Sequence, residues 1–425
     1  MNRIPHQAKV RRTAAALLLA ALLGGCLGQP SLAPGTPGID TPVIIAPDAP
    51  PPAAGTPAPT LPTATTRLTR DPYLQDVTAE AVTVLWHTAD PTVGTLLLRP
   101  QNDPAGTPLT LREPSAGTNH RLRVAGLQAG TVYTYSLEAD GGLLGASHTF
   151  RSAPTAGAAD PFSFLVWGDS GCGCPPQMTL AAQMAHSTPQ LLLHTGDMIY
   201  EDGAANLFDP NFFTPYAGLL ATAPVYPVLG NHDVITEKGS PWLHAFSLPG
   251  DAGAANPRYY SFDYGNAHFI ALDSEEDFGP TSAQYSWLLT DLQSAATQRA
   301  TWRFAYFHRP PYSSGFGHGS SYDLRESWSP LFERFGVDVV FSGHEHNYER
   351  SLPRTDYAAV GGTHPVTYVV TGGGGKQLYN VGHSPWTAAS SMVYHFVQVR
   401  LAGTHLHLDA IDSNGTVFDT LDLSH

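Results

Sequence analysis

Five short apolar runs, each leading directly into a polar block, constrain the fold of this chain more than any other feature. The runs are FSFLVW, QLLLH, VYPVL, WRFAYF and VDVVF, and each is typical of a buried strand. Helical spacing is found between them in PPQMTLAAQMAHS, SAQYSWLLTDLQSAA and YDLRESWSPLFERF. Strands that alternate with helices predict α/β layers, in which sites form at the carboxyl ends of the strands.

The polar blocks that follow these strands are rich in candidate metal ligands. They are GDSG (168–171), GDMIY (196–200), GNHD (230–233), AYFH (305–308) and GHEH (343–346). A single Gly-Asp after a strand is usually an ordinary turn. Together, however, the blocks offer carboxylate, amide, phenol and imidazole donors in excess of what one ion takes. They therefore predict two metal ions that share a bridging carboxylate, an arrangement suited to phosphoryl displacement.

In order and spacing, the blocks resemble the signature of the purple acid phosphatases within the calcineurin-like metallophosphoesterases: GDxG, GDxxY, GNH(D/E), VxxH and GHxH. One position differs, because Ala305 replaces the valine of the fourth block. That valine is a strand core residue and not a ligand. The resemblance covers most of residues 67–425. It implies a two-sheet βαβ metallophosphoesterase sandwich with helices outside over residues 160–425.

The resemblance also implies which donors hold each ion. The first ion, ferric iron in the family, would be bound by Asp169, Asp197, Tyr200 and His346. Asp197 would bridge to a second ion, either iron, zinc or manganese. The remaining ligands of that second ion would be Asn231, His308 and His344.

Further residues are expected to contact the substrate. His232 and His318 match the family's histidines that bind the substrate phosphate and assist the leaving group, and they are the predicted catalytic residues. The match at His318 rests on its spacing after His308. Asn231 is expected to contact the phosphate as well. Arg309 and Tyr348 lie beside ligands in the sequence and are predicted to line the substrate pocket.

Charge counting gives a reason for Tyr200. Asp169, Asp197, an ionised Tyr200 and a bridging hydroxide carry four negative charges, so a ferric–divalent pair leaves the core at plus one. A phenol has an ordinary pKa of about 10, and its ionisation therefore needs a strongly acidic cation nearby. Such a cation also lowers the pKa of bound water. We interpret Tyr200 as a ferric ligand. The alternative is a tyrosine that only packs under the loop.

Residues 67–154 have a different pattern, with period two. AVTVLWHT, HRLRV and TVYTYSLEA alternate apolar and polar residues between Pro/Gly turns, which predicts an antiparallel β-sandwich. GLQAGTVY resembles the corner of fibronectin type III domains, with Tyr133 as the corner tyrosine. His87, His120 and His148 are scattered here and do not form a catalytic group.

The N-terminus reads as a targeting segment. Residues 1–25 combine a basic start with the apolar run AAALLLAALLGG. The stretch LLGGC (22–26) resembles the lipobox of bacterial lipoproteins, with Cys26 as the lipid-bearing residue. Ordinary secretion and an uncleaved anchor are the alternatives. Residues 26–66 are rich in Pro, Ala, Thr and Gly and predict a disordered tether. All three alternatives place the folded part outside the cytoplasm.

A cysteine pair and a glycine run also lead to predictions. Cys172 and Cys174 predict a disulfide in an oxidising compartment, with metal ligation or free thiols as alternatives. The stretch TGGGGK (371–376) lacks P-loop spacing and is expected to let the backbone pass close to the site.

These observations predict a secreted phosphatase that hydrolyses phosphate monoesters by a metal-bound hydroxide, as the resemblance implies. A net charge of −14 disfavours nucleic acid as a partner, and membrane contact is expected only through Cys26. The oligomeric state is left open. One alternative is a phosphodiesterase acting on nucleotides or phospholipid headgroups with the same site. The other is a surface-binding protein with a vestigial site.

Overall fold

The computed structural model describes residues 63–250 and 258–425, which belong to one compact unit, Pro59–His425. The predicted signal segment, Cys26 and most of the predicted tether lie outside the described residues. Within the described part of the chain, no helix is both long enough and apolar enough to cross a bilayer.

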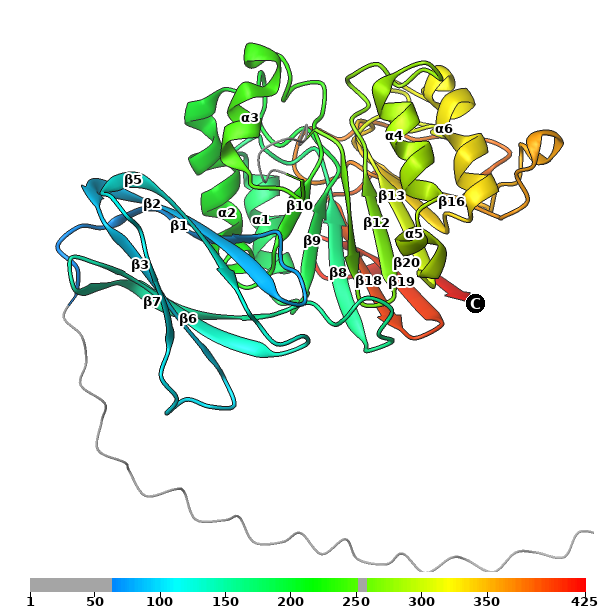
Figure 1. Ribbon diagram of the computed structural model, residues 1–425. Helices are drawn as coiled ribbons and strands as arrows, with labels where there is room; N and C mark the ends of the chain where they lie inside the picture. Colours follow the sequence, from blue (N-terminus) through cyan, green and yellow to red (C-terminus); the bar gives the residue numbers. More distant parts are fainter. Residues whose placement is uncertain (1–62, 251–257) are drawn as a thin grey trace, which may run out of the picture. The chain divides into compact units, whose positions relative to one another are not determined.

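The N-terminal part is an antiparallel β-sandwich, as predicted (Figure 1). One sheet has the order β1-β2-β5 and the other β4-β3-β6-β7, formed by β1 (Leu68–Gln75), β2 (Ala81–Thr92), β3 (Gly94–Pro100), β4 (Leu109–Arg112), β5 (Gly117–Ala125), β6 (Val132–Ala139) and β7 (Gly142–Arg151). Alternate residues of β2, Val82, Val84 and Trp86, are fully buried between the sheets. The Tyr133 hydroxyl accepts the N–H of Gln128 at 2.8 Å, which forms the predicted tyrosine corner.

Two mixed sheets follow. The first has the order β10-β9-β8-β18-β19-β20, from β8 (Phe162–Trp167), β9 (Leu191–His194), β10 (Val225–Pro227), β18 (His395–Ala402), β19 (His405–Asp412) and β20 (Val417–Ser424). The second has the order β11-β12-β13-β14-β16-β15-β17, from β11 (Tyr260–Tyr264), β12 (Ala267–Ala271), β13 (Trp302–Tyr306), β14 (Val339–Ser342), β15 (Tyr348–Ser351), β16 (Thr367–Thr371) and β17 (Thr387–Ser391). β8–β10 are parallel, as are β12, β13, β14 and β16. All five predicted buried strands are therefore present.

Helices cover the outer faces of these sheets (Figure 1). They are α1 (Pro175–Met184), α2 (Thr214–Leu220), α3 (Ser240–Ala245), α4 (Ala283–Leu292), α5 (Ala295–Arg299) and α6 (Tyr322–Phe335), with short helical turns η1 (Ala205–Leu207), η2 (Asp209–Phe213), η3 (Thr236–Gly239) and η4 (Ala358–Val360). One core joins α1–α3 to β8–β10 and continues between the two sheets. A second core packs α4 and α6 against β12–β14. The predicted two-sheet sandwich with helices outside is confirmed.

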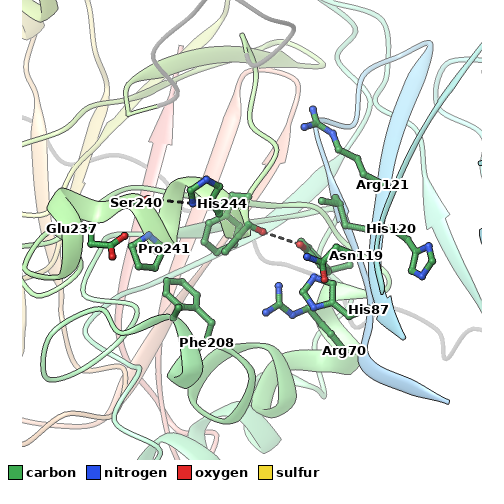
Figure 2. Close-up of a pocket in the computed structure, with 15 residues that line it drawn as sticks. Arg70, His87, Asn119, His120, Arg121, Phe208, Glu237, Ser240, Pro241 and His244 are labelled. Carbon is green, nitrogen blue, oxygen red and sulfur yellow. Dashed lines mark hydrogen bonds between the residues drawn. The ribbon is translucent and has the colours of Figure 1, made fainter. Parts of the chain in front are cut away.

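The β-sandwich packs directly against the two-sheet domain. Tyr73 and Tyr135 donate their hydroxyls to the carbonyls of Ala245 and Ala221, each at 2.8 Å. Between β1, β2 and β5 on one side and η1 and α3 on the other lies a cavity of about 440 Å³ (Figure 2). Arg70 and His87 line it from the sandwich and His244 lines it from α3. The cavity contains none of the predicted metal ligands, so it is separate from the candidate site.

His268 of β12 ties three elements together and gives a testable pH effect. It is 3% exposed, and its ring nitrogens lie 2.7 Å from Asp263 of β11 and 2.9 Å from Asp291 of α4. Burial alone would lower the pKa of His268, but the two carboxylates outweigh it and raise the pKa to about 9. A histidine pKa raised by folding stabilises the native state below the unfolded pKa, and this stabilisation is lost as the pH rises through 9.

We expect His268→Gln to destabilise the protein by at most about 3 kcal/mol at pH 6 and by much less at pH 10. Denaturant unfolding of both proteins across this range measures the difference. His405→Gln is the matched control, because His405 is exposed and bonds only to Ser424. A difference that stays constant with pH would contradict the prediction.

Candidate metal centre

Six of the seven predicted metal ligands lie just beyond the carboxyl ends of parallel strands. Asp169 follows β8, Asp197 follows β9 and Asn231 follows β10, all in the first sheet. In the second sheet His308 follows β13, and both His344 and His346 follow β14. Since these strand ends face one another across the two-sheet core, six donors from distant parts of the sequence converge.

Three of these residues have left-handed backbone conformations, with φ of 58° at Asp169, 54° at Asp197 and 69° at His344. Non-glycine residues adopt this region at a cost, so such residues cluster at functional sites. The turn at His344 directs its N–H to both carboxylate oxygens of Asp169, at 3.0 Å each. The backbone of one block therefore holds the side chain of another.

One group of donors gathers around Tyr200. Its hydroxyl lies 3.2 Å from Asp169 Oδ1, 3.0 Å from Asp197 Oδ2 and 3.1 Å from His346 Nε2. His346 Nε2 is 3.4 Å from Asp169 Oδ1. All four side chains are buried, with Tyr200 4% exposed. Tyr200 therefore points into the same small volume as two carboxylates and an imidazole.

A second group of donors adjoins the first through Asp197. His308 Nε2 lies 3.4 Å from Asp197 Oδ2, 3.1 Å from Asn231 Oδ1 and 3.1 Å from His344 Nδ1. Ligand atoms of Asp169, Asp197 and His308 all lie within 4.8 Å of one another. The structure thus brings together all seven predicted donors, in two groups with one carboxylate in common.

Backbone carbonyls fix which ring nitrogen faces the centre. His308 Nδ1 lies 2.9 Å from the Thr195 carbonyl, and His346 Nδ1 lies 2.7 Å from the Gln377 carbonyl. A carbonyl can only accept, so each Nδ1 carries the proton. The Nε2 atoms that face the carboxylates are left as the donors available to a cation, which is the usual outer arrangement of histidine ligands.

The electrostatics of the centre favour positive charge. Burial alone would lower the pKa of His308, but the Asp197 carboxylate raises it to about 10. Burial and the Asp197 and Asp169 carboxylates raise the pKa of Tyr200 well above its ordinary value. A phenolate at Tyr200 therefore requires a strongly charged cation among these same donors, and the oxygen and imidazole set fits such an ion.

Three of the predicted substrate residues, His232, His318 and Arg309, lie on the open side of the centre. His232 is partly exposed, and its Nε2 is 4.0 Å from Asp197 Oδ2 while its Nδ1 bonds the Glu201 carbonyl at 2.5 Å. The exposed His318 stacks its ring on His344, with centroids 3.9 Å apart. Arg309 and His318 line an open cavity of about 220 Å³ beside His344. Arg309 is held there by a two-pronged ion pair with Glu275.

Tyr348 does not lie on this cavity, and its predicted substrate contact is wrong. Its side chain is fully buried, and its hydroxyl donates to Asp419 at 2.6 Å. Arg350 pairs with the same carboxylate. The residue sits on β15, where alternation turns it into the core and away from the site.

Two residues that the sequence analysis did not single out shape the centre. Asp233 is buried, and its carboxylate accepts the N–H of Met198, Ile199 and Gly230, which ties two ligand loops together. Burial and the Asp197 carboxylate raise the pKa of Asp233 to about 7. Its place at the end of GNHD was an available signal. Tyr379 stacks on His346 at 4.2 Å, but no local pattern marks it.

The smaller predictions next to the site are confirmed. Cys172 and Cys174 form a disulfide. The glycine run after β16 passes close to the ligands, since Gly374 N–H donates to the Gly168 carbonyl at 3.0 Å and Lys376 N–H to that of Asp169 at 3.0 Å. A Cβ at Gly372 would lie 2.7 Å from Asp169 Oδ2.

Comparison with known proteins agrees with this geometry. The model of the calcineurin-like phosphoesterase family matches residues 162–348, which hold all seven donors. Acid phosphatase type 7 of Homo sapiens is 28% identical over 342 residues, which is 71% of this chain and 75% of that protein. A purple acid phosphatase from yellow lupin (Lupinus luteus) seeds has a similar fold, with a TM-score of 0.73 at 21% identity over 83% of this chain and 74% of the lupin chain.

The chain contains a calcineurin-like phosphoesterase region at residues 162–348 and is related to the purple acid phosphatases. A further relative, the Fe(3+)-Zn(2+) purple acid phosphatase 12 of Arabidopsis thaliana, is 28% identical over 251 residues, 56% of this chain and 53% of that protein. The chain spans 53–56% of the length of its Arabidopsis relatives. These relatives are acid phosphatases by name, and the matched family is one of phosphoesterases.

Proposed function

We propose that this chain is an extracytoplasmic phosphatase that hydrolyses phosphate monoesters with the help of two metal ions. The observation that carries the proposal is the pair of donor groups joined at Asp197. One ion would be held by Asp169, Asp197, Tyr200 and His346, and the other by Asp197, Asn231, His308 and His344. A single ion leaves donors unused, and two ions near a shared carboxylate are the usual arrangement for phosphoryl transfer.

The donor chemistry favours ferric iron in the first group and a divalent ion in the second. The first group contains the phenol, whose pKa burial and the carboxylates raise, so only a strongly acidic cation ionises it. The second contains two neutral imidazoles and an amide, which suit a divalent transition metal or zinc. The Arabidopsis relative named for an Fe(3+)-Zn(2+) pair supports this assignment. When bound, the ions would supply charge neutralisation and an acidic water.

The residues around the open cavity would bind and orient the ester. Arg309, fixed by Glu275, presents a guanidinium toward the cavity that suits phosphate oxygens. His232 directs Nε2 inward because its Nδ1 is taken by the Glu201 carbonyl. From the other side His318 would donate a proton to the leaving oxygen. The buried donors would thus bind the metal ions, and the histidines at the open cavity would bind the substrate.

Replacing Tyr200 by phenylalanine tests the ferric assignment. The ring keeps its packing against His232 and His346, while the hydroxyl that meets Asp169 and Asp197 is lost. We expect the iron-loaded wild-type protein to absorb visible light and the variant to lose that absorption while retaining its fold. Absorbance per bound iron and far-UV circular dichroism measure both. A variant with full visible absorption would contradict the assignment.

The proposed location outside the cytoplasm draws support from the Cys172–Cys174 disulfide, since disulfides persist in oxidising compartments. Lipid attachment at Cys26 remains a prediction from the sequence. Mass spectrometry of the protein from membrane and soluble fractions would test it.

A side-by-side assay of a chromogenic phosphate monoester and a diester, across pH and with iron plus zinc or manganese, tests the proposed activity. Faster monoester turnover in acid is the expected result. Faster diester turnover would favour a phosphodiesterase instead. Absence of both activities in a metal-loaded protein would favour the surface-binding alternative.

A further inference from the structure

Glu345, between the two histidines of GHEH, has its carboxylate wrapped by the loop that carries His318. The side chain is fully buried. Its Oε1 accepts the N–H groups of His318 and Gly319, and its Oε2 accepts that of Gly317 at 3.2 Å. Hydrogen bonds to an ionised carboxylate are roughly twice as strong as neutral ones. Three successive amides on one carboxylate therefore fix the backbone of this loop.

Other contacts hold the two ends of the loop: Ser314 bonds Glu349, the Phe316 N–H donates to the Asn380 carbonyl at 3.0 Å, and the Ser320 hydroxyl bonds the Ser313 carbonyl. His318 is exposed, and the segment SSGFGHGSS is built from glycine and serine, which lose much conformational freedom on ordering. Around two of its glycines, close packing comes from the Glu345 carboxylate and Tyr379. A Cβ at Gly315 would lie 2.2 Å from Glu345 Oε2, and one at Gly317 would lie 2.3 Å from the Tyr379 ring.

Anchoring of the loop determines where the His318 imidazole lies. Its ring stacks on His344, one residue before Glu345, at 3.9 Å and 23°. The same turn therefore supplies a proposed metal ligand, His344, and the carboxylate that anchors His318 beside it. Because both come from one rigid block after β14, the distance between the metal centre and His318 is set by the block and not by the loop.

We propose that Glu345 is the positioning residue for His318, and that it holds the imidazole where a proton reaches the leaving oxygen of the ester. This inference rests on the proposed function for its chemical readout. It assigns Glu345 no contact with substrate or metal. Its effect passes through the backbone amides of residues 317–319.

Glu345→Gln tests the proposal, because an amide nitrogen then faces N–H groups that require an acceptor. We expect kcat/KM to fall about 10- to 100-fold for an alkyl phosphate, whose leaving oxygen needs a proton, and clearly less for p-nitrophenyl phosphate. The metal content is expected to stay at the wild-type value. In a double-mutant cycle, His318→Ala plus Glu345→Gln should be no slower than His318→Ala alone.

Glu333→Gln is the matched control. Glu333 is also fully buried, and it accepts the backbone N–H of Asp356 and Tyr357 far from the site. We expect it to lower stability without changing the ratio between the two esters. Equal losses on both esters for Glu345→Gln, or additive effects in the cycle, would overturn the proposal.

Hydrogen–deuterium exchange gives a readout that does not depend on activity. Faster exchange at residues 317–319 in Glu345→Gln than in wild type or Glu333→Gln supports the tie between carboxylate and loop, and unchanged exchange overturns it. If wild type hydrolyses neither ester, the proposed function fails, and the exchange measurement still decides whether Glu345 positions this loop.

Discussion

Replacing His308 by alanine is expected to lower kcat by about a thousandfold or more and to remove one of two bound metal ions. His308 stands at the centre of the second donor group, 3.4 Å from Asp197, 3.1 Å from Asn231 and 3.1 Å from His344. Without it the second ion would keep only three ligands. A metal ion supplies several kcal/mol of transition-state charge stabilisation, and each 1.36 kcal/mol is a factor of ten in rate.

Metal analysis of the purified variant, together with steady-state kinetics on the preferred ester, measures both effects. His405→Ala is the matched control, because this exposed histidine bonds only to Ser424 and should leave metal content and rate unchanged. Thermal unfolding distinguishes loss of the ion from loss of the fold. A His308→Ala protein that holds two ions and turns over at the wild-type rate would rule out this ligand assignment.

Replacing Gly230 by alanine is expected to disrupt both metal positions at once. A Cβ at this position would lie 2.2 Å from Asp197 Oδ1 and 2.3 Å from the Asp197 backbone nitrogen. The nitrogen belongs to the main chain, so relief requires the whole Asp197 turn to move. Since Asp197 is the carboxylate common to both donor groups, its displacement weakens both, and a shift near 1 Å in such a site costs about 100-fold in rate.

Overpacking of this kind also lowers stability by about 1–3 kcal/mol. Metal stoichiometry, kcat/KM and denaturant unfolding report the three consequences. Gly218→Ala is a sharp control, because this helical glycine of α2 has open space where a Cβ would be placed, and alanine there should stabilise the helix by up to about 1 kcal/mol. Full metal binding by Gly230→Ala would show that the turn tolerates a side chain.

Several elements begin and end at the residues that the sequence predicts. The run FSFLVW is β8 and YDLRESWSPLFERF is α6. The helix predicted over residues 282–296 is instead α4 and α5, because α4 ends at Leu292 and the Ser294 hydroxyl accepts the N–H of Thr297 to begin α5. A weak apolar periodicity cannot reveal such a cap-induced break.

The sequence by itself determined which residues are donors and that each follows a buried strand. Those facts are local, since a short apolar run followed by Gly and a polar side chain can be read without knowing its neighbours. The glycines that these blocks require for steric reasons can be recognised in the sequence for the same reason.

Only the tertiary structure decided how the donors divide into two groups around Asp197. The approach of His308 to Asp197 and Asn231, the burial of Tyr348 against Asp419, and the closure of the His318 loop on Glu345 join residues 27 to 111 positions apart. Such contacts depend on strand order and on the packing of two sheets, which no local pattern encodes. Local chemistry therefore fixes the set of candidate donors, and the packing of the sheets fixes which donors lie together and which residues hold them in place.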